Sequence, residues 1–479
     1  MNLSSKIAYN TIVQMAGKVI STILGLIALA IMARYLGQTG FGSYTTVITF
    51  VSFFAIIADL GLTLVTVQMI SRPGVDEARA LNNLFGLRLI SILLFLSLAP
   101  LIVIFVPYTK DIKIGVVIAV LSFLFPALNQ ILIGLFQKKL RMDKAVIAET
   151  ASRIALVIGI YLAIKLQSGL NGILWASVIS AALNFIVSYL LAAKYHFLKP
   201  AFDFSLWQEI ISKSWPLAIT TILNLLYLKT DTLILSLEKS QAEVGLYGAA
   251  YRIIDVLTTL PYMFAGIILP ILTVSWFEHK KDYFASVLQK SFDLMAIFSL
   301  PIIAGTLVLA KPLIVLVAGN DFAPSSPILK IIIFALAAIF LGCMFAHAII
   351  AIGKQRKMIS SYIFVGISSI ILYLIFIPPF SYYGAAAVTI YSEVAIAFLS
   401  AYVVWKYTKF IPNFKIVGKT IIASIIMGGA LYLIPNNFYY TWAGLTVGII
   451  IAVLVYFFSL YGIKGITKND LKILLNRKL

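Results

Sequence analysis

The stretch GILWASVISAALNFIVSYLLAA at residues 172–193 contains no charged side chain, and Lys194 follows it directly. As a helix it is long enough to cross about 30 Å of hydrocarbon, which takes about 20 residues. Thirteen further predominantly apolar stretches occupy residues 7–33, 42–70, 84–106, 112–136, 146–165, 214–237, 243–275, 292–318, 327–352, 358–377, 384–405, 416–434 and 441–461. The sequence therefore predicts an all-α polytopic membrane protein with about 14 transmembrane helices.

The stretch at residues 172–193 has a counterpart at residues 384–405. The two align without a gap at Gly172/Gly384, Ser180/Ser392, Ser188/Ser400 and Lys194-Tyr195/Lys406-Tyr407. Two weaker matches occur in the same order, FGSY at 41–44 with VGLY at 244–247 and QKK at 137–139 with QRK at 355–357. A repeat of six spans keeps its orientation in the membrane. The pattern thus predicts two six-helix bundles related by a pseudo-two-fold axis along the membrane normal, with a substrate path between them.

The repeat gives the predicted domain boundaries. The N-terminal six-helix bundle covers residues 1–195, and the C-terminal six-helix bundle covers residues 213–407. Residues 196–212 form a linker with aromatic side chains among charges, which predicts a position on the cytoplasmic interface. Residues 408–479 lie outside the repeat and supply two extra transmembrane helices and a basic cytoplasmic tail.

Lysine and arginine are concentrated on one side of the predicted membrane. If both termini are cytoplasmic, the cytoplasmic gaps and ends hold 27 of the 37 basic residues, and the outer gaps hold seven. Cytoplasmic loops retain Lys and Arg, so this asymmetry fixes the orientation. It also accounts for the net charge of +19, and we therefore expect no nucleic-acid partner.

Signatures of catalysis and of cofactor binding are missing from the sequence. There is no Walker loop and no GxSxG motif, and the histidines His196, His279 and His347 are isolated. Cys343 is the only cysteine, which excludes a disulfide framework and a cysteine metal site. We expect no catalytic residue, no metal and no cofactor, and we expect that the protein is not an enzyme.

Charged residues inside the spans are the candidates for function. A charge at the centre of a bilayer costs roughly 2.5–3.5 kcal/mol on insertion scales, so such residues usually face a cavity or pair with each other. Seven stand out: Lys18, Asp59, Lys229, Asp231, Arg252, Asp255 and Glu393.

Helical spacing places polar residues on one face of each of four spans. The faces are Asn10, Gln14, Lys18, Ser21 and Gly25; Thr45, Thr49, Ser52, Asp59, Thr63 and Thr66; Thr220, Asn224, Tyr227 and Asp231; and Gly248, Arg252, Asp255, Thr259, Tyr262 and Gly266. These are the first two spans of each predicted bundle, so the pattern indicates helices that line a shared aqueous path. Gln14 and Asn224 are its uncharged candidates.

Structural roles stay open for several of the charged residues. Arg252 and Asp255, at i and i+3, could form a purely structural ion pair. Asp59 could cap or bend its helix. Asp231 lies near the outer end of its span and could be interfacial, and Glu393 is a single carboxylate.

Three motifs carry a resemblance to a known family. Residues 33–44, ARYLGQTGFGSY, resemble the "ARxLG…FGxY" signature of polysaccharide-export flippases. DLGL at residues 59–62 resembles an element of their second helix, and Asp231 followed by VGLYGAAYR at residues 244–252 resembles their seventh-to-eighth helix junction. With the fourteen spans, the chain resembles the Wzx-type flippases of the multidrug/oligosaccharidyl-lipid/polysaccharide exporter superfamily.

The resemblance implies transport of an undecaprenyl-diphosphate-linked oligosaccharide across the bacterial cytoplasmic membrane, driven by an ion gradient, membrane potential or both. A diphosphate needs cations, so we expect Lys18 and Arg252 to contact it, and Arg88 and Arg153 to receive it first. Antiport of H⁺ or Na⁺ would use Asp59, Asp255, Asp231 or Glu393. Membrane lipid and polysaccharide assembly proteins are the other expected partners. The sugar, the coupling ion and the oligomeric state cannot be deduced from the sequence.

Two other functions remain open at this point. A multidrug or cation antiporter of the same superfamily would share the fold, but it usually has twelve spans and an acidic cavity. An integral-membrane polysaccharide polymerase would need larger outer loops or a nucleotide-sugar site.

Overall fold

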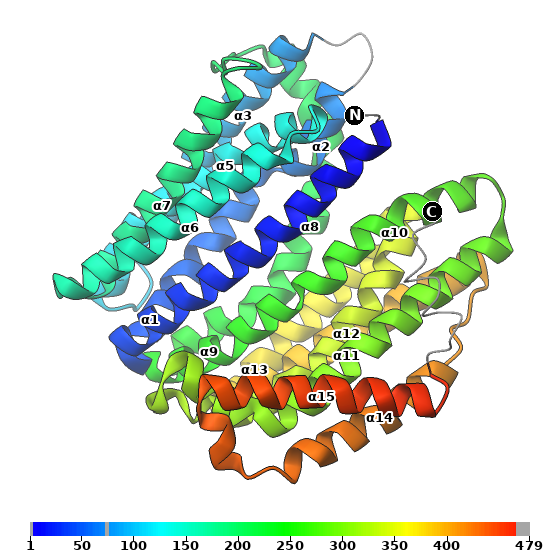
Figure 1. Cartoon of the computed structure of the whole chain (residues 1–479). Coiled ribbons are helices and arrows are strands. Elements are labelled where there is room, and N and C mark those ends of the chain that lie inside the picture. Colours follow the sequence, from blue (N-terminus) through cyan, green and yellow to red (C-terminus); the bar gives the residue numbers. More distant parts are fainter. Residues whose placement is uncertain (1–2, 72–75, 466–479) are drawn as a thin grey trace. The chain divides into compact units, whose positions relative to one another are not determined.

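The structure, a computed structural model, describes residues 3–71 and 76–465, apart from the side chains of residues 3–8, 11, 64, 216–217, 220–221 and 224–228. In these ranges every regular element is a helix, and no strand occurs (Figure 1). The α-helices are α1 (Leu3–Asp59), α2 (Leu62–Ile70), α3 (Glu77–Leu96), α4 (Leu98–Val103), α5 (Lys110–Lys138), α6 (Met142–Lys165), α7 (Gly169–Ala192), α8 (Phe204–Glu238), α9 (Gln241–Leu257), α10 (Thr259–Phe277), α11 (Lys281–Ala318), α12 (Ser325–Ala351), α13 (Ile359–Thr408), α14 (Lys415–Tyr432) and α15 (Trp442–Gly462).

The helices account for the predicted spans. Among the described residues, 11 helical stretches are long and apolar enough to cross a membrane. Two of these stretches, Ile12–Asp59 and Gln355–Thr408, are each a pair of helices joined at a kink, at Gly37 and at Ser381. Helix α8 supplies the span predicted at residues 214–237. The predicted fold class, an all-α polytopic membrane protein with about 14 transmembrane helices, is confirmed.

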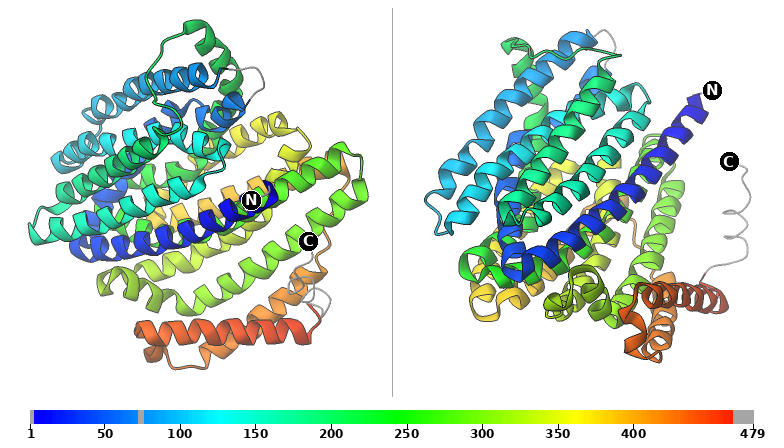
Figure 2. Two further views of the ribbon diagram at one scale, coloured as in Figure 1. Left: turned by 45° about the horizontal axis from the view of Figure 1, so that its top comes forward. Right: turned by 60° about the vertical axis from the view of Figure 1, so that its left-hand side comes forward.

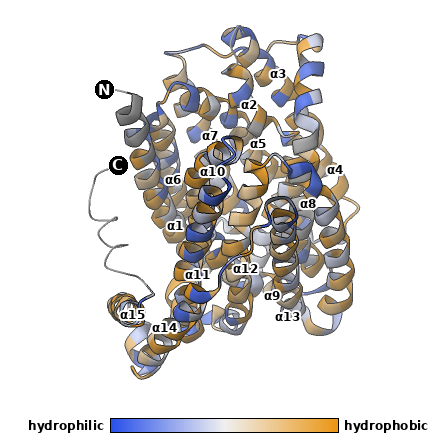
Figure 3. Cartoon of the chain, turned by 90° about the vertical axis from the view of Figure 1, so that its right-hand side faces the viewer, coloured by the Kyte–Doolittle hydropathy of each residue, from blue (hydrophilic) through white to orange (hydrophobic). Residues whose placement is uncertain are grey.

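Hydrophobic residues predominate along most of these helices (Figure 3), and many of the large ones are exposed. On α14 and α15, for example, Ile425, Leu454 and Phe458 are all exposed. A water-soluble monomer rarely exposes apolar patches of this extent. Lipid tails therefore cover these faces, and the protein is a multi-pass membrane protein.

The chain divides by internal contacts into two compact units, Met1–Gly248 and Ala249–Leu479. The first unit contains α1 to α8 and the beginning of α9. Its core is one apolar cluster in which Leu84, Ile112, Val116 and Leu132 are fully buried. The predicted bundles 1–195 and 213–407 are defined by the sequence repeat, whereas these units are defined by internal contacts. The bundle boundaries therefore stay a prediction.

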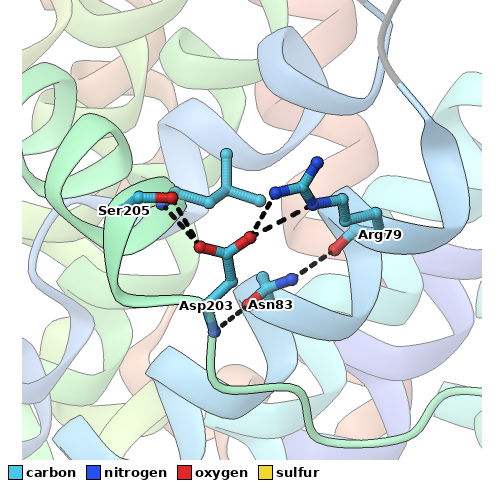
Figure 4. Close-up of polar contacts among 5 residues, drawn as sticks. Arg79, Asn83, Asp203 and Ser205 are labelled. Atoms are coloured by element: carbon cyan, nitrogen blue, oxygen red, sulfur yellow. Dashed lines mark hydrogen bonds and ion pairs between the residues drawn. The ribbon is translucent and has the colours of Figure 1, made fainter.

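The linker before α8 is fastened to the start of α3 (Figure 4). Asp203 forms an ion pair with Arg79, and its backbone N–H donates to Asn83 Oδ1 at 2.8 Å. The Asp203 carboxylate also accepts from Ser205 Oγ at 2.6 Å and from the Leu206 N–H at 3.3 Å, which caps α8. Because of this cap, α8 begins at Phe204, inside the predicted linker 196–212. Hydrogen bonds from Ser205 and from Arg79 hold the pKa of Asp203 well below its usual range.

Replacing Asp203 with alanine is expected to loosen this linker. The variant loses the α8 cap and the ion pair to Arg79, so trypsin should cut after Lys194 several-fold faster in inside-out vesicles. Lys213→Ala is the matched control, because it removes only an exposed i,i+4 ion pair with Glu209. Equal cleavage rates for the two variants would show that the Asp203 contacts do not hold the linker.

The second unit, Ala249–Leu479, contains the rest of α9 and helices α10 to α15. Helices α14 and α15 form an antiparallel pair (Figure 2) and share a small core with α11. Leu309, Met427 and Tyr439 belong to this core, and Tyr456 Oη donates to the Ile297 carbonyl at 2.7 Å. The two helices that lie outside the sequence repeat are thus packed on α11 of this unit.

Candidate functional site

The first half of α1 presents Lys18 and Gln14 on an exposed face. The adjoining part of the same stripe is fixed, because Asn10 accepts from the Met142 N–H at 2.8 Å and donates to the Leu140 carbonyl at 2.7 Å. A Cβ on Gly17 would lie only 2.4 Å from a methyl group of Val146, so α1 packs tightly against α6 there. The predicted polar stripe is therefore divided into a packing part and an exposed part.

Lys18 is available to an anionic ligand. It is exposed, and in the described ranges 3–71 and 76–465 it makes no ion pair. Gly25, two turns further along the same face, has open space around its Cα. An ammonium group on an open face of a spanning helix can neutralise a phosphate without first giving up another partner.

Arg88 on α3 is buried and neutralised by Asp59. Only 1% of Arg88 is exposed. Its Nη2 contacts the Asp59 carboxylate and donates to Thr63 Oγ1 at 2.9 Å, and Thr63 in turn donates to Asp59 at 2.5 Å. Helices α1, α2 and α3 therefore share one ion-pair network inside the first unit.

This network sits at a break in the helix. Leu60 and Gly61 both have positive φ values, 49° and 72°, and they separate α1 from α2. Ser91 on α3 donates to the carbonyl of Ala58 at 2.8 Å, which satisfies one of the carbonyls that the break releases. DLGL at residues 59–62 therefore ends one helix and starts the next, with its aspartate bound to α3.

The burial of Arg88 limits what it can do. Its Nε and Nη1 atoms are buried and have no hydrogen-bond partner among the described residues. A substrate phosphate could reach them only if the helices around them separated. The structure thus places Arg88 with Asp59, away from the exposed position that a first contact with substrate requires. Arg153 on α6 is partly exposed and makes no ion pair within residues 3–71 and 76–465.

Asp231 on α8 is fully buried inside the first unit. Tyr247 Oη on α9 donates to its Oδ2 at 2.6 Å, and the Thr232 N–H donates to its Oδ1 at 2.5 Å. The carboxylate therefore joins the C-terminal part of α8 to the N-terminal part of α9. The side chain of Asn224, the other candidate on α8, lies outside the described residues.

In the second unit, Arg252 and Asp255 on α9 form an i,i+3 ion pair at 3.7 Å. Their side chains are 37% and 36% exposed. An exposed pair of this kind contributes little to stability, about 0–1 kcal/mol. Arg252 can therefore turn to another anion at small cost, which distinguishes it from Arg88.

An apolar groove of about 380 Å³ runs beside the helix that carries Arg252. Four helices of the second unit form its walls. Its lining includes Ile253 and Leu257 of α9, Gly305 of α11, Met427 of α14 and Val453 of α15. The volume lies at the lower end of ligand pockets. An apolar groove and a partly exposed arginine on one helix suit an amphiphile with an anionic head.

Glu393 on α13 is buried in the second unit, 7% exposed. Its charge acts on the hydroxyl groups of Tyr262 on α10 and Tyr362 on α13. One turn earlier, Thr389 shares a hydrogen bond with Tyr373 at 3.2 Å. No group of acidic, His or Cys side chains in the described part of the chain could hold a metal ion.

Sequence reasoning did not find the Asp59–Arg88 pair or the groove. The two charges are on different helices, so no helical spacing connects them. The groove residues come from four separate spans, and each looks in the sequence like any lipid-facing residue. The break after Asp59 had a local signal, the glycine that follows it at position 61.

Comparisons with known proteins agree with this architecture. Residues 7–276, more than half of the chain, match the family described as "Polysaccharide biosynthesis protein". The capsular polysaccharide biosynthesis protein CapF of Staphylococcus aureus is 23% identical over 294 residues, which are 61% of this chain and 74% of CapF.

Two solved structures show the same fold. The lipid II flippase MurJ in an inward closed conformation superposes with a TM-score of 0.77 at 18% identity, over 94% of this chain and 98% of that one. A multidrug resistance MATE family transporter of the MOP superfamily, in an inward-facing conformation, gives a TM-score of 0.69 at 13% identity, over 83% of this chain and 98% of that one.

Proposed function

Because the chain belongs to the polysaccharide biosynthesis protein family, with the resemblance to Wzx-type flippases confirmed, we propose that it flips an undecaprenyl-diphosphate-linked oligosaccharide. The substrate would move through the protein from the inner to the outer leaflet of the bacterial cytoplasmic membrane. In this proposal both termini of the protein are cytoplasmic. A glycan cannot cross hydrocarbon alone, since its hydroxyl groups would lose their hydrogen bonds to water.

The observation that carries this proposal is that Arg252 lies on α9, the helix whose Ile253 and Leu257 line the apolar groove. In our proposal the guanidinium binds the diphosphate with charge-assisted hydrogen bonds, and the polyprenyl tail enters the groove formed by α9, α11, α14 and α15. Lipid is as apolar as the groove, so the groove contributes position rather than affinity. Lys18, an exposed cation on α1 of the first unit, supplies a second contact to the diphosphate.

The membrane potential supports outward movement of the head group. Carrying about two negative charges outward across an inside-negative membrane releases roughly 4.6 kcal/mol per 100 mV, twice the value for one charge. Antiport of H⁺ or Na⁺ would add to this and reset the carrier. Among the carboxylates, Asp59 is least suited to exchange a proton, because protonation would leave the buried Arg88 without its counter-charge. Asp231, Asp255 and Glu393 stay candidates for ion coupling.

Filling the groove is expected to reduce export without unfolding the chain. A Cβ at Gly305 would contact only the terminal methyl of Met427, at 3.7 Å, so Gly305→Phe can place its ring in the groove. Gly429→Phe is the matched control on α14, where nothing lies within 4 Å of the added Cβ. We expect several-fold slower export of lipid-linked glycan for Gly305→Phe alone. If a stable Gly305→Phe chain exports glycan at the wild-type rate, the polyprenyl tail does not bind in the groove.

The multidrug or cation antiporter is the second candidate, favoured only by the shared fold. A cationic drug needs an acidic cavity, whereas the exposed Lys18 and the exposed Arg252 would repel it. The two functions are separated by a transport assay with a cationic dye and with labelled lipid-linked glycan in the same vesicles. Our proposal expects movement of the glycan and none of the dye.

A further inference from the structure

Helices α1 and α9 cross at two glycines with almost no space between their backbones. A Cβ on Gly42 would lie 1.6 Å from the Gln241 carbonyl oxygen, and a Cβ on Gly245 would lie 2.1 Å from the Gln38 carbonyl oxygen. Real Cβ atoms essentially never come closer than 3.0 Å to another heavy atom. Only glycine at both positions permits this approach of backbone to backbone.

The contact is reciprocal. Gln241 and Gly245 follow Gln38 and Gly42 by 203 positions, and the two glycines belong to the repeated elements FGSY and VGLY. Gly42 meets Gln241 while Gly245 meets Gln38, and each added Cβ would also lie about equally far from the other glycine's N atom, 2.9 and 3.0 Å. A contact in which i touches j and the equivalent of j touches the equivalent of i marks a local two-fold axis.

Neighbouring residues complete the contact along the same two helices. Thr46 Oγ1 donates to Gln241 Oε1 at 2.7 Å. One turn inward, an added Cβ on Gly248 would lie 2.8 Å from Thr45 Oγ1. The approach therefore extends over a full helical turn, and it includes close van der Waals contact and the hydrogen bond from Thr46 to Gln241.

The charge pattern of the sequence places these residues at the outer ends of their spans. The gap before residue 42 and the gap before residue 243 both face outward in the predicted orientation. A two-fold axis along the membrane normal is also where the repeat predicts the substrate path. A backbone contact on that axis, at the outer end, would close the path toward the outside.

We propose that the Gly42–Gly245 contact is the outer gate of the transport path. In this structure the gate is closed, and the two glycines allow it to close because no side chain stands between the helices. Van der Waals contact between the two backbones is lost when the helices separate, so the gate can open when a glycan leaves. The proposal rests on the proposed flippase function, but its test includes a reading that needs no substrate.

The test uses a chain without other thiols, Cys343→Ser, with Thr49→Cys as a reporter one turn inward from Thr45. A membrane-impermeant maleimide is added outside intact cells. Gly42→Ala or Gly245→Ala should raise the labelling rate roughly tenfold, the shift that one strong steric penalty produces in a two-state equilibrium. Gly25→Ala on the same helix is the control, because its added Cβ meets nothing within 4 Å, and it should leave the rate unchanged.

A second variant covers the case in which the alanine chains do not fold. In Cys343→Ser with Thr46→Cys and Gln241→Cys, an oxidant should join the two helices and stop glycan export, and a reductant should restore it. Two results would contradict the proposed gate. One is an equal labelling rate in folded Gly42→Ala and Gly25→Ala chains, and the other is undiminished glycan export by the cross-linked chain. If the wild-type chain exports no glycan, the proposed flippase function is wrong. The labelling rates still show whether the contact opens, because labelling does not require the substrate.

Discussion

Replacing Lys18 or Arg252 with glutamate is expected to stop export of lipid-linked glycan while leaving the protein folded in the membrane. Each cation would make charge-assisted hydrogen bonds to the diphosphate, worth about 1.5–3 kcal/mol each. Losing one such bond slows transport by about 10- to 150-fold, and a carboxylate in its place adds repulsion. The measurement is accumulation of lipid-linked glycan in a strain that carries only the variant chain.

Three controls make the charge reversal specific. Lys110→Glu makes the same charge change at an exposed helix start far from Lys18 in sequence, and it should export normally. Lys18→Arg and Arg252→Lys keep the charge and should retain part of the activity, although lysine cannot reproduce the bidentate geometry of arginine. Normal export by Lys18→Glu or by Arg252→Glu would remove that residue from the diphosphate site.

The second large effect is expected at the ion pair of Asp59 and Arg88. Asp59→Ala leaves a guanidinium that is 1% exposed without its counter-charge, which should destabilise the fold by about 3–5 kcal/mol. Replacing both partners with apolar residues, Asp59→Leu with Arg88→Met, should be nearly neutral in stability. Thermal unfolding of the purified chains in detergent measures both effects.

The same double variant separates two roles for Arg88. If Arg88 only fastens α3 to the break in DLGL, the double variant should be stable and should still export glycan. If the double variant is as stable as the wild type but does not export glycan, Arg88 contributes to binding of the diphosphate. Asp59 would then also have a role beyond fastening the helix.

Part of this architecture could be predicted because it depends on local composition. Each span is an apolar run, and the asymmetry of Lys and Arg needs no tertiary information. The main difference between the predicted and the observed helices is at Gly37. The sequence predicts two separate spans, 7–33 and 42–70, whereas the structure has one element, Leu3–Asp59, with a kink at this residue. A single residue with φ 63° separates the two helices, so no loop is needed between them.

The pairings between helices could not be predicted, because helical spacing says only which residues share a face. Asp59 and Thr63 share a face, as expected, but nothing in the sequence indicates that Arg88 of another helix faces them. Lys18 and Arg88 look alike in the sequence, as cations of spans or span ends. Burial separates them, since one is exposed on α1 and the other is enclosed by its own ion pair.

The central claim is that this chain moves a lipid-linked oligosaccharide between leaflets. The most direct measurement places the purified chain in vesicles with undecaprenyl-diphosphate-linked oligosaccharide from a strain that lacks the protein, and follows the fraction of glycan open to a modifying enzyme outside. We predict that the wild-type chain exchanges the glycan between leaflets and that Arg252→Glu does not. A protected fraction that stays the same with and without the wild-type chain would contradict the account.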